Sequence, residues 1–224
     1  PIEKRWVVKP QGNPEAVAAM AAATGISPVL ANLLVQRGID TLEKAEIFNP
    51  QLSDLHDPFL MKDMDKAVER VERAVRNREK IMVYGDYDVD GTTAVALVYK
   101  FLRQIGHKDL LFYIPDRYTE GTDLAKGIDH AARKGATLII ALDCGIKAIE
   151  KVDYAKRKGV DFIIATITPG QEIPRAVAVL DPNARLFYPF DELSGCGGGI
   201  KLVQAYCQKT EFRSSKIEPL LDLL

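Results

Sequence analysis

Short apolar runs recur along the last two thirds of the chain, each of a length suited to one buried strand. They occupy residues 81–84, 110–114, 137–142, 160–164 and 176–180. Stretches with apolar residues at helical spacing stand between several of them, as in 94–105 and 148–158. Strands that alternate with helices in this way predict an α/β fold: a mainly parallel sheet of about five strands, joined by right-handed crossovers and flanked by helices.

The first 63 residues have a different pattern, with helical and irregular stretches. Pro14 and Ser27 stand where two helices would begin, and Thr41 stands where a third would begin. We therefore expect an N-terminal helical region, residues 1–63, followed by an α/β domain, residues 64–224.

Composition and charge narrow the classes of function. The chain has 224 residues, of which 47% are hydrophobic, and its net charge is −1. No general positive field attracts nucleic acid, so any binding of DNA needs a local patch. The arginines of the helix expected at 64–79 alternate with glutamates, which indicates a solvated, ion-paired face rather than such a patch.

The three cysteines are far apart in the sequence, which argues against a disulfide framework or a zinc site. They fit a reducing compartment. No apolar run has the length of a membrane span. We expect a soluble cytoplasmic protein.

Three aspartates follow the first strand of the α/β domain at alternate positions. Asp86, Asp88 and Asp90 stand between the strand at 81–84 and a helix that begins near Gly91. Loops at this edge of an open α/β sheet bind ligands. Three carboxylates so close together repel one another unless a cation neutralises them, and Mg²⁺, Mn²⁺ and Ca²⁺ prefer oxygen ligands. A metal site is one interpretation, and an acidic surface turn with Asp90 as the helix N-cap is the other.

Two later segments belong to the same edge of the predicted sheet. Asp143 follows the third predicted strand, so a metal site shared with Asp88 and Asp90 would bring their carboxylate oxygens within about 10 Å. The alternative is that Asp143 only caps the helix after Gly145. Residues 194–199 read Ser-Gly-Cys-Gly-Gly-Gly before a helix; they would offer backbone N–H groups to an anion or form a hinge.

The stretch Tyr-Gly-Asp-Tyr-Asp-Val-Asp-Gly at 84–91 resembles motif I of the DHH phosphoesterases, in the form found in RecJ-type exonucleases. Other stretches resemble the same family in the same order, and together they cover nearly the whole chain. They are residues 9–12, 26–34, 54–61, 114–117, 141–145 and 193–197.

The resemblance implies a 5′-to-3′ exonuclease that hydrolyses phosphodiester bonds of single-stranded DNA and depends on Mn or Mg. It implies catalytic and metal-binding roles for Asp88, Asp90 and Asp143, with Asp86 as a further metal ligand. We expect the protein to act as a monomer. The residues that would contact the DNA backbone or its phosphates are Arg117, Ser194, Gly195, Gly197 and Gly198.

The sequence departs from this family at the motif that gives the family its name. An Asp-His-His triplet should follow the strand that ends at Ile164, but this chain has Ala165, Thr166 and Ile167 there. The loop after Gly121 is shorter than in the family, and the domain is truncated before the family's fourth motif and second domain. We therefore expect weak binding of the cation and impaired hydrolysis.

Two other functions remain open. The missing histidines favour a catalytically inactive scaffold or binding domain with the same fold. Another DHH-type enzyme, an oligonucleotide or cyclic-dinucleotide phosphodiesterase, is the third interpretation. The RecJ-like character of the first 60 residues argues against that one.

Overall fold

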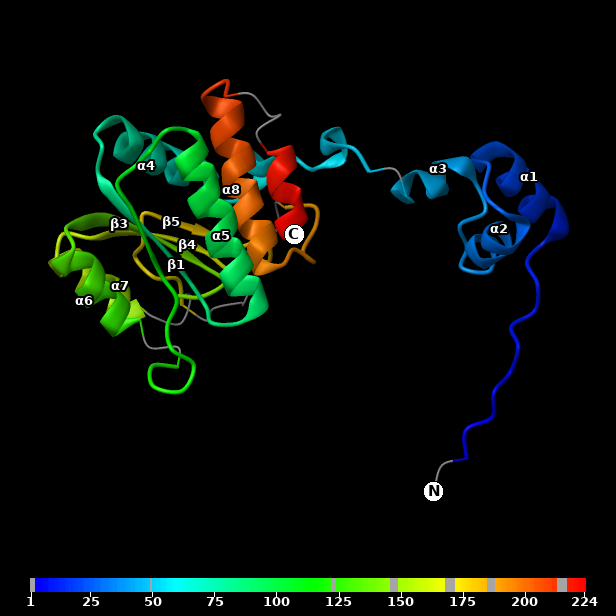
Figure 1. Cartoon of the computed structure of the whole chain (residues 1–224), viewed down its shortest axis with the longest axis horizontal. Coiled ribbons are helices and arrows are strands. Elements are labelled where there is room, and N and C mark those ends of the chain that lie inside the picture. Colours follow the sequence, from blue (N-terminus) through cyan, green and yellow to red (C-terminus); the bar gives the residue numbers. More distant parts are fainter. Residues whose placement is uncertain are drawn as a thin grey trace. The chain divides into compact units, whose positions relative to one another are not determined.

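The computed structural model describes residues 3–48, 50–121, 124–145, 149–167, 172–184, 188–212 and 217–224. The chain divides into two compact units, Pro1–Leu55 and His56–Leu224 (Figure 1). Within the described ranges, no helix combines the length and the apolar character needed to cross a membrane.

The first unit is helical, as predicted. The side chains of Asn13, Ser27 and Thr41 accept hydrogen bonds from backbone N–H groups in the first turns of the three α-helices found among its described residues. Polar caps therefore fix the helix starts, as the sequence predicted for Ser27 and Thr41. The elements are α1 (Pro14–Thr24), α2 (Pro28–Val35), α3 (Leu42–Ala45) and the 3₁₀ turns η1 (Glu46–Phe48) and η2 (Leu52–Asp54).

The second unit contains the predicted parallel sheet. Its strands follow the order β2-β1-β3-β4-β5, and every neighbouring pair runs parallel. The predicted α/β fold class is therefore confirmed. Because the strands all point the same way, the residues that follow them share one edge of the sheet. The strands are β1 (Lys80–Gly85), β2 (Leu110–Tyr113), β3 (Ala136–Leu142), β4 (Asp161–Ala165) and β5 (Ala178–Leu180).

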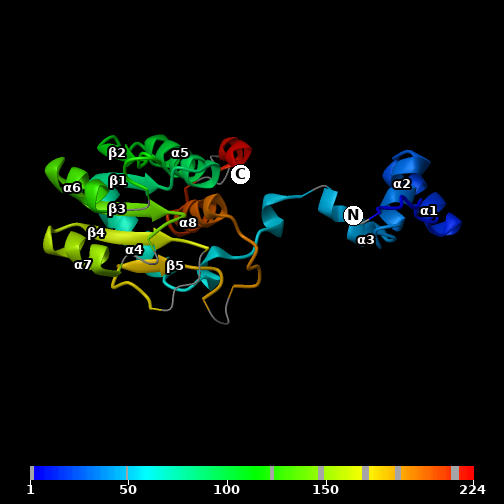
Figure 2. The same ribbon diagram turned by 90° about the horizontal axis from the view of Figure 1, so that it is seen from below.

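Helices cover both faces of this sheet (Figure 2). Side chains of β1 alternate between two cores: Ile81 and Val83 belong to one, Met82 and Tyr84 to the other. Burial on both faces explains why the strands read as unbroken apolar runs. The first core is covered by α4 (Met64–Arg76), α5 (Val89–Gln104), α8 (Gly195–Lys209) and the 3₁₀ segment η5 (Glu218–Leu223), and the second by α6 (Ala125–Arg133) and α7 (Ile149–Arg157). The 3₁₀ segment η3 (Pro58–Leu60) contacts α4 and α8.

One arginine of α4 is buried rather than solvated. Arg70 is 5% exposed; its Nε donates to Asp161 Oδ2 and its Nη2 to Glu79 Oε2, both at 2.7 Å. The prediction of a solvated face is therefore wrong for Arg70. It holds for Arg76, which is exposed and lies 3.9 Å from Glu72. The bonds of Arg70 fix α4 to the edge where the strands begin.

Candidate active site

The motif I loop joins β1 to α5 by a sharp turn. Asp86 follows β1 directly, and its Oδ1 accepts a hydrogen bond from the N–H of Tyr87 (2.7 Å). Asp88 is the N-cap of α5, and its Oδ1 accepts from the N–H of Gly91 (2.8 Å). Residue 91 is a glycine because a Cβ there would lie 2.5 Å from the backbone of Asp86. The helix cap is thus Asp88, and the interpretation of Asp90 as the cap is wrong.

Asp90 reaches a different helix. Its Oδ2 accepts from the N–H of Gly195 and its Oδ1 from the N–H of Cys196, both at 2.7 Å. These residues begin α8, and such first-turn N–H groups have no partner within a helix. A carboxylate is also favoured there by the partial positive charge of the helix N-terminus. Asp90 therefore joins the start of α5 to the start of α8.

The glycine-rich segment does not precede the helix but forms the N-cap and first turns of α8. Ser194 is the N-cap; its Oγ accepts from the N–H of Gly197 and its carbonyl from the N–H of Gly198, both at 3.0 Å. The anion at this helix N-terminus is the chain's own Asp90. The N–H groups of Gly195, Gly197 and Gly198 therefore all donate to partners within the chain, while Ser194 is exposed.

Asp143 lies against the same helix start. It follows β3 with a left-handed backbone (φ 58°), and its N–H donates to the carbonyl of Ala165 (2.8 Å). A Cβ at Gly195 would lie 2.5 Å from Asp143 Cγ and 2.6 Å from Asp143 Oδ1, so the approach requires a glycine. Asp90 binds the N–H of that same glycine. By bond lengths, carboxylate oxygens of Asp90 and Asp143 therefore lie within about 8 Å of each other.

Asp86, Asp88, Asp90 and Asp143 form a group that we call the acid cluster, and its first three members affect the pKa of the fourth. Burial, and then the negative charges of Asp90, Asp88 and Asp86, raise the pKa of Asp143 to about 7. An aspartate that titrates near neutral pH lacks compensating positive charge around its ionised form. The cluster therefore offers carboxylate oxygens that suit a divalent cation in both charge and ligand type.

The segment found in place of Asp-His-His borders this acid cluster. β4 ends at Ala165, whose carbonyl accepts the N–H of Asp143. Thr166 is buried, and its N–H donates to the carbonyl of Leu180 (3.0 Å). Residues 165–167 thus bring neither a carboxylate nor an imidazole to the acids. Among the described residues, no group of three or more His, Cys, Asp and Glu side chains is arranged to hold a metal ion.

Arg117 lies beside the motif I loop. Its guanidinium carbon is 5.3 Å from the centroid of the Tyr87 ring, which is cation–π geometry. Arg117 is exposed, and Tyr87 stands between Asp86 and Asp88 in the loop. The structure thus places an exposed positive charge next to the segment that carries the acids.

Two features of the site escaped prediction from the sequence. Nothing in the spacing indicated that Asp90 binds α8 or that Tyr87 contacts Arg117. A usable signal exists for the first: a helix that opens with glycines leaves its N–H groups uncovered, and these need an acceptor.

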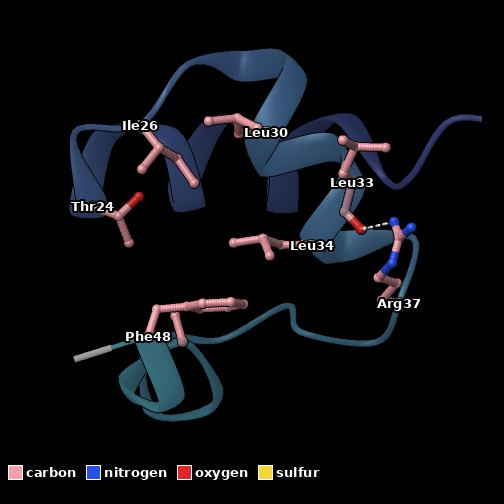
Figure 3. Close-up of a pocket in the computed structure, with 8 residues that line it drawn as sticks. Thr24, Ile26, Leu30, Leu33, Leu34, Arg37 and Phe48 are labelled. Atoms are coloured by element: carbon pink, nitrogen blue, oxygen red, sulfur yellow. Dashed lines mark hydrogen bonds between the residues drawn. The ribbon is translucent and has the colours of Figure 1, made fainter. Parts of the chain in front are cut away.

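A pocket in the first unit has a different character (Figure 3). Its volume is about 760 Å³, and most of its lining is apolar. The guanidinium of Arg37 donates from Nη1 to the carbonyl of Leu33 (3.1 Å). This lining suits hydrophobic contact rather than hydrolysis, so the candidate active site is the acid cluster of the second unit. The lining residues are Thr24, Ile26, Leu30, Leu33, Leu34, Arg37, Ala45 and Phe48.

Most of the second unit matches the model of a known protein family. Residues 80–224 match the model of the DHH family, N-terminal domain. The chain belongs to the DHH family. The matched residues include the whole acid cluster, from the motif I loop to Asp143.

Relatives of this DHH chain include RecJ exonucleases. It is 38% identical over 205 residues to the single-stranded-DNA-specific exonuclease RecJ of Bacillus subtilis. That match covers 90% of this chain and 26% of the relative, so the chain spans about a quarter of the relative's length. The predicted resemblance to RecJ-type members of the family is confirmed.

Solved structures of RecJ share the fold of this DHH chain. A crystal structure of exonuclease RecJ bound to manganese matches with a TM-score of 0.61 and 27% identity, covering 68% of this chain and 39% of that one. RecJ from Thermus thermophilus in complex with Mn²⁺ matches with a TM-score of 0.69 and 24% identity. This second match covers 91% of this chain and 28% of that one, and it supports the fold alone.

Proposed function

We propose that this DHH chain is part of a RecJ-type enzyme that hydrolyses single-stranded DNA in the 5′-to-3′ direction, with Mn or Mg as cofactor. The observation that carries the proposal is that the carboxylates of Asp90 and Asp143 both lie against Gly195 and therefore close to each other. The names of the relatives support it, since they describe single-stranded-DNA-specific exonucleases. In this proposal residues 64–224 form a DHH-type phosphoesterase domain behind a helical region, 1–63, and the protein is a cytoplasmic monomer.

The carboxylates would hold the cation. Asp86, Asp88, Asp90 and Asp143 offer the oxygen ligands that Mn²⁺ and Mg²⁺ take, and a bound cation would relieve the repulsion that raises the pKa of Asp143. When bound, the cation supplies Lewis-acid activation of water and stabilisation of negative charge at phosphorus. The manganese bound by a RecJ structure of the same fold supports this choice of ion.

The chain's own residues would position the acids and the DNA. Arg117 is exposed beside the motif I loop and would contact a backbone phosphate, as would the exposed hydroxyl of Ser194. Asp90 holds the start of α8, which keeps Gly195 against Asp143. We assign the glycines of α8 to this close packing rather than to phosphate binding, because their N–H groups donate within the chain.

Activity and cation binding should be weak in this chain. Ala165, Thr166 and Ile167 offer one neutral hydroxyl where the family has a carboxylate and two imidazoles. The loss of one electrostatic donor from an active site costs about 10²–10³ in rate. A second candidate function is therefore an inactive domain that binds DNA without cutting it. It is favoured by the lack of a three-residue metal cluster among the described residues.

The test measures nucleotide release from 5′-labelled single-stranded DNA in the presence of Mn²⁺. We expect slow, Mn²⁺-dependent release that is lost in Asp143→Asn, because this change removes a carboxylate and keeps the size of the side chain. The matched control is Asp65→Asn, at an exposed aspartate of α4, which should keep the activity.

Three outcomes would change the proposal. Release at an ordinary enzymatic rate, about 1–10³ s⁻¹, would contradict the impairment. Release that survives Asp143→Asn would exclude the acid cluster as the site. A folded chain that binds DNA but releases no nucleotide would establish the inactive domain instead.

A further inference from the structure

Exposed lysines and arginines gather at the edge of the sheet opposite to the acids. Four helices end there, and in each case the next strand begins a few residues later. The exposed basic residues of these connections are Arg76 and Arg78 before β1, Arg103 and Lys108 before β2, Arg133 and Lys134 before β3, and Lys156, Arg157 and Lys158 before β4. We call this set the basic edge.

Contacts made by Lys80 and Arg73 link the four connections along this edge. Lys80, at the start of β1, donates from Nζ to the carbonyl of Lys134 (3.0 Å) and lies 3.4 Å from Asp109. It therefore touches the connections that precede β3 and β2. Arg73 of α4 lies 3.1 Å from Asp161, the first residue of β4. Because neighbouring strands are about 4.8 Å apart, the four strand starts form a row of about 15 Å.

The acids of this edge are already engaged, so its excess charge is positive. Glu79 and Asp161 accept from Arg70, and Asp109 lies against Lys80. Within the described part of the chain, each connection has at least one basic residue that forms no ion pair; Arg78, Lys108, Lys134 and Lys156 represent the four connections.

Helix ends explain only part of this charge. A cation in the last turn is favoured by the negative end of the helix dipole, and one per helix would suffice. Each connection carries two or three, some of them beyond the helix end. The chain as a whole has a net charge of −1, so the positive field is local to this edge.

We propose that the basic edge binds the sugar–phosphate backbone of single-stranded nucleic acid, as a second contact away from the acid cluster. The seven residues of β3 separate the two edges by about 23 Å. The ring of Tyr154, near this edge, already faces Lys158 Nζ (4.8 Å) and the Arg157 guanidinium (5.8 Å). The edge therefore offers charge rather than a stacking platform, and its binding should show no base preference.

The test uses the full chain in EDTA, so that cation binding and hydrolysis do not contribute. Fluorescence anisotropy measures the affinity for labelled oligo-dT of about 20 nucleotides at several salt concentrations. The test variant removes one cation from each connection: Arg78→Gln, Lys108→Gln, Lys134→Gln and Lys156→Gln. The control removes the same charge from exposed positions elsewhere: Arg5→Gln, Lys4→Gln, Lys62→Gln and Lys100→Gln.

At low salt the test variant should bind the oligonucleotide at least about tenfold more weakly than the control variant. A plot of log affinity against log salt should also be less steep for the test variant, by up to about 3, or ~0.7 for each lost phosphate contact. Single changes at Lys134 and Lys156 should each give part of this loss, which guards against misfolding of the fourfold variant. Equal affinities of test and control variants would overturn the proposal.

Two further outcomes separate this inference from the proposed hydrolysis. Polyglutamate of equal charge that binds as tightly, with the same dependence on the four side chains, would overturn the assignment to nucleic acid. A chain that binds oligo-dT through the basic edge but never releases nucleotide would keep this inference and remove the hydrolytic function.

Discussion

Gly195 sets how closely the two carboxylates approach each other. Its N–H binds Asp90, and the space where its side chain would be holds the carboxyl group of Asp143. A glycine within a helix normally costs stability, because alanine is the better helix former. At this position the missing Cβ is required by the packing.

Gly195→Ala should destabilise the fold by about 1–3 kcal/mol, because the new Cβ would overlap the Asp143 side chain. It should also weaken Mn²⁺ binding in a calorimetric titration. The matched control is Gly198→Ala in the same helix, where a Cβ would lie 3.6 Å from Ala165 Cβ, an ordinary contact. Urea unfolding compares the two variants; equal stability would contradict the steric role of Gly195.

Asp143 should make the stability of the chain depend on pH. Its pKa of about 7 in the folded chain is above its ordinary value of 3.8. Between these values the folded chain binds more protons than the unfolded chain, so stability falls as pH rises from about 4 to about 7. In EDTA, Asp143→Asn should therefore raise the free energy of unfolding at pH 8 more than at pH 4. Urea unfolding at both values checks this, and an identical effect at both would argue against the raised pKa.

At the scale of elements, α8 connects the parts of the site. Its first two N–H groups hold Asp90 of α5, and its first residue packs on Asp143 after β3. Further along the helix, Lys201 is buried, and its Nζ donates to the carbonyl of His56 (2.8 Å) and to Gln204 Oε1 (2.9 Å). The helix thus also holds the segment at which the second unit begins.

Asp90→Ala should lower the free energy of unfolding by about 2–4 kcal/mol, because it leaves two N–H groups at the start of α8 without an acceptor. Asp90→Asn keeps one oxygen acceptor and should cost clearly less. Urea unfolding of both variants measures the difference. If the two variants were equally stable, the bonds to Gly195 and Cys196 would not be what holds the helix.

The sequence predicted the strands and helices better than the hydrogen bonds between residues that are distant in the sequence. Every strand was visible as an apolar run, because burial on both faces removes polar residues from it. β5 is shorter than its run at 176–180, since its pairing with β4 begins only at Ala178. The bond from Asp90 to Gly195 joins residues 105 apart, and local spacing carries no information about such a pair. The burial of Arg70 was missed for the same reason, because its partner Asp161 is distant in sequence.

At the scale of the whole molecule, a net charge of −1 conceals an uneven distribution. The motif I aspartates and Asp143 lie where the strands of the second unit end, and the basic edge lies where they begin. The carboxylates repel a DNA strand that carries no bound cation. A DNA strand bound at the basic edge would therefore leave the carboxylates of the opposite edge free to bind cations. The two edges can therefore be tested separately, one in EDTA and the other with Mn²⁺.

The order of the strands has a consequence for the synthesis of the protein. β1 lies between β2 and β3, so it stays unpaired on one side until roughly 50 more residues have been made, on the order of 3–10 s of translation. The hydrogen bond between Asp90 and Gly195 forms later still, because Gly195 follows Asp90 by 105 residues. A nascent chain on the ribosome therefore carries Asp90 well before the helix that binds it exists. The acid cluster forms only near the end of translation of this segment.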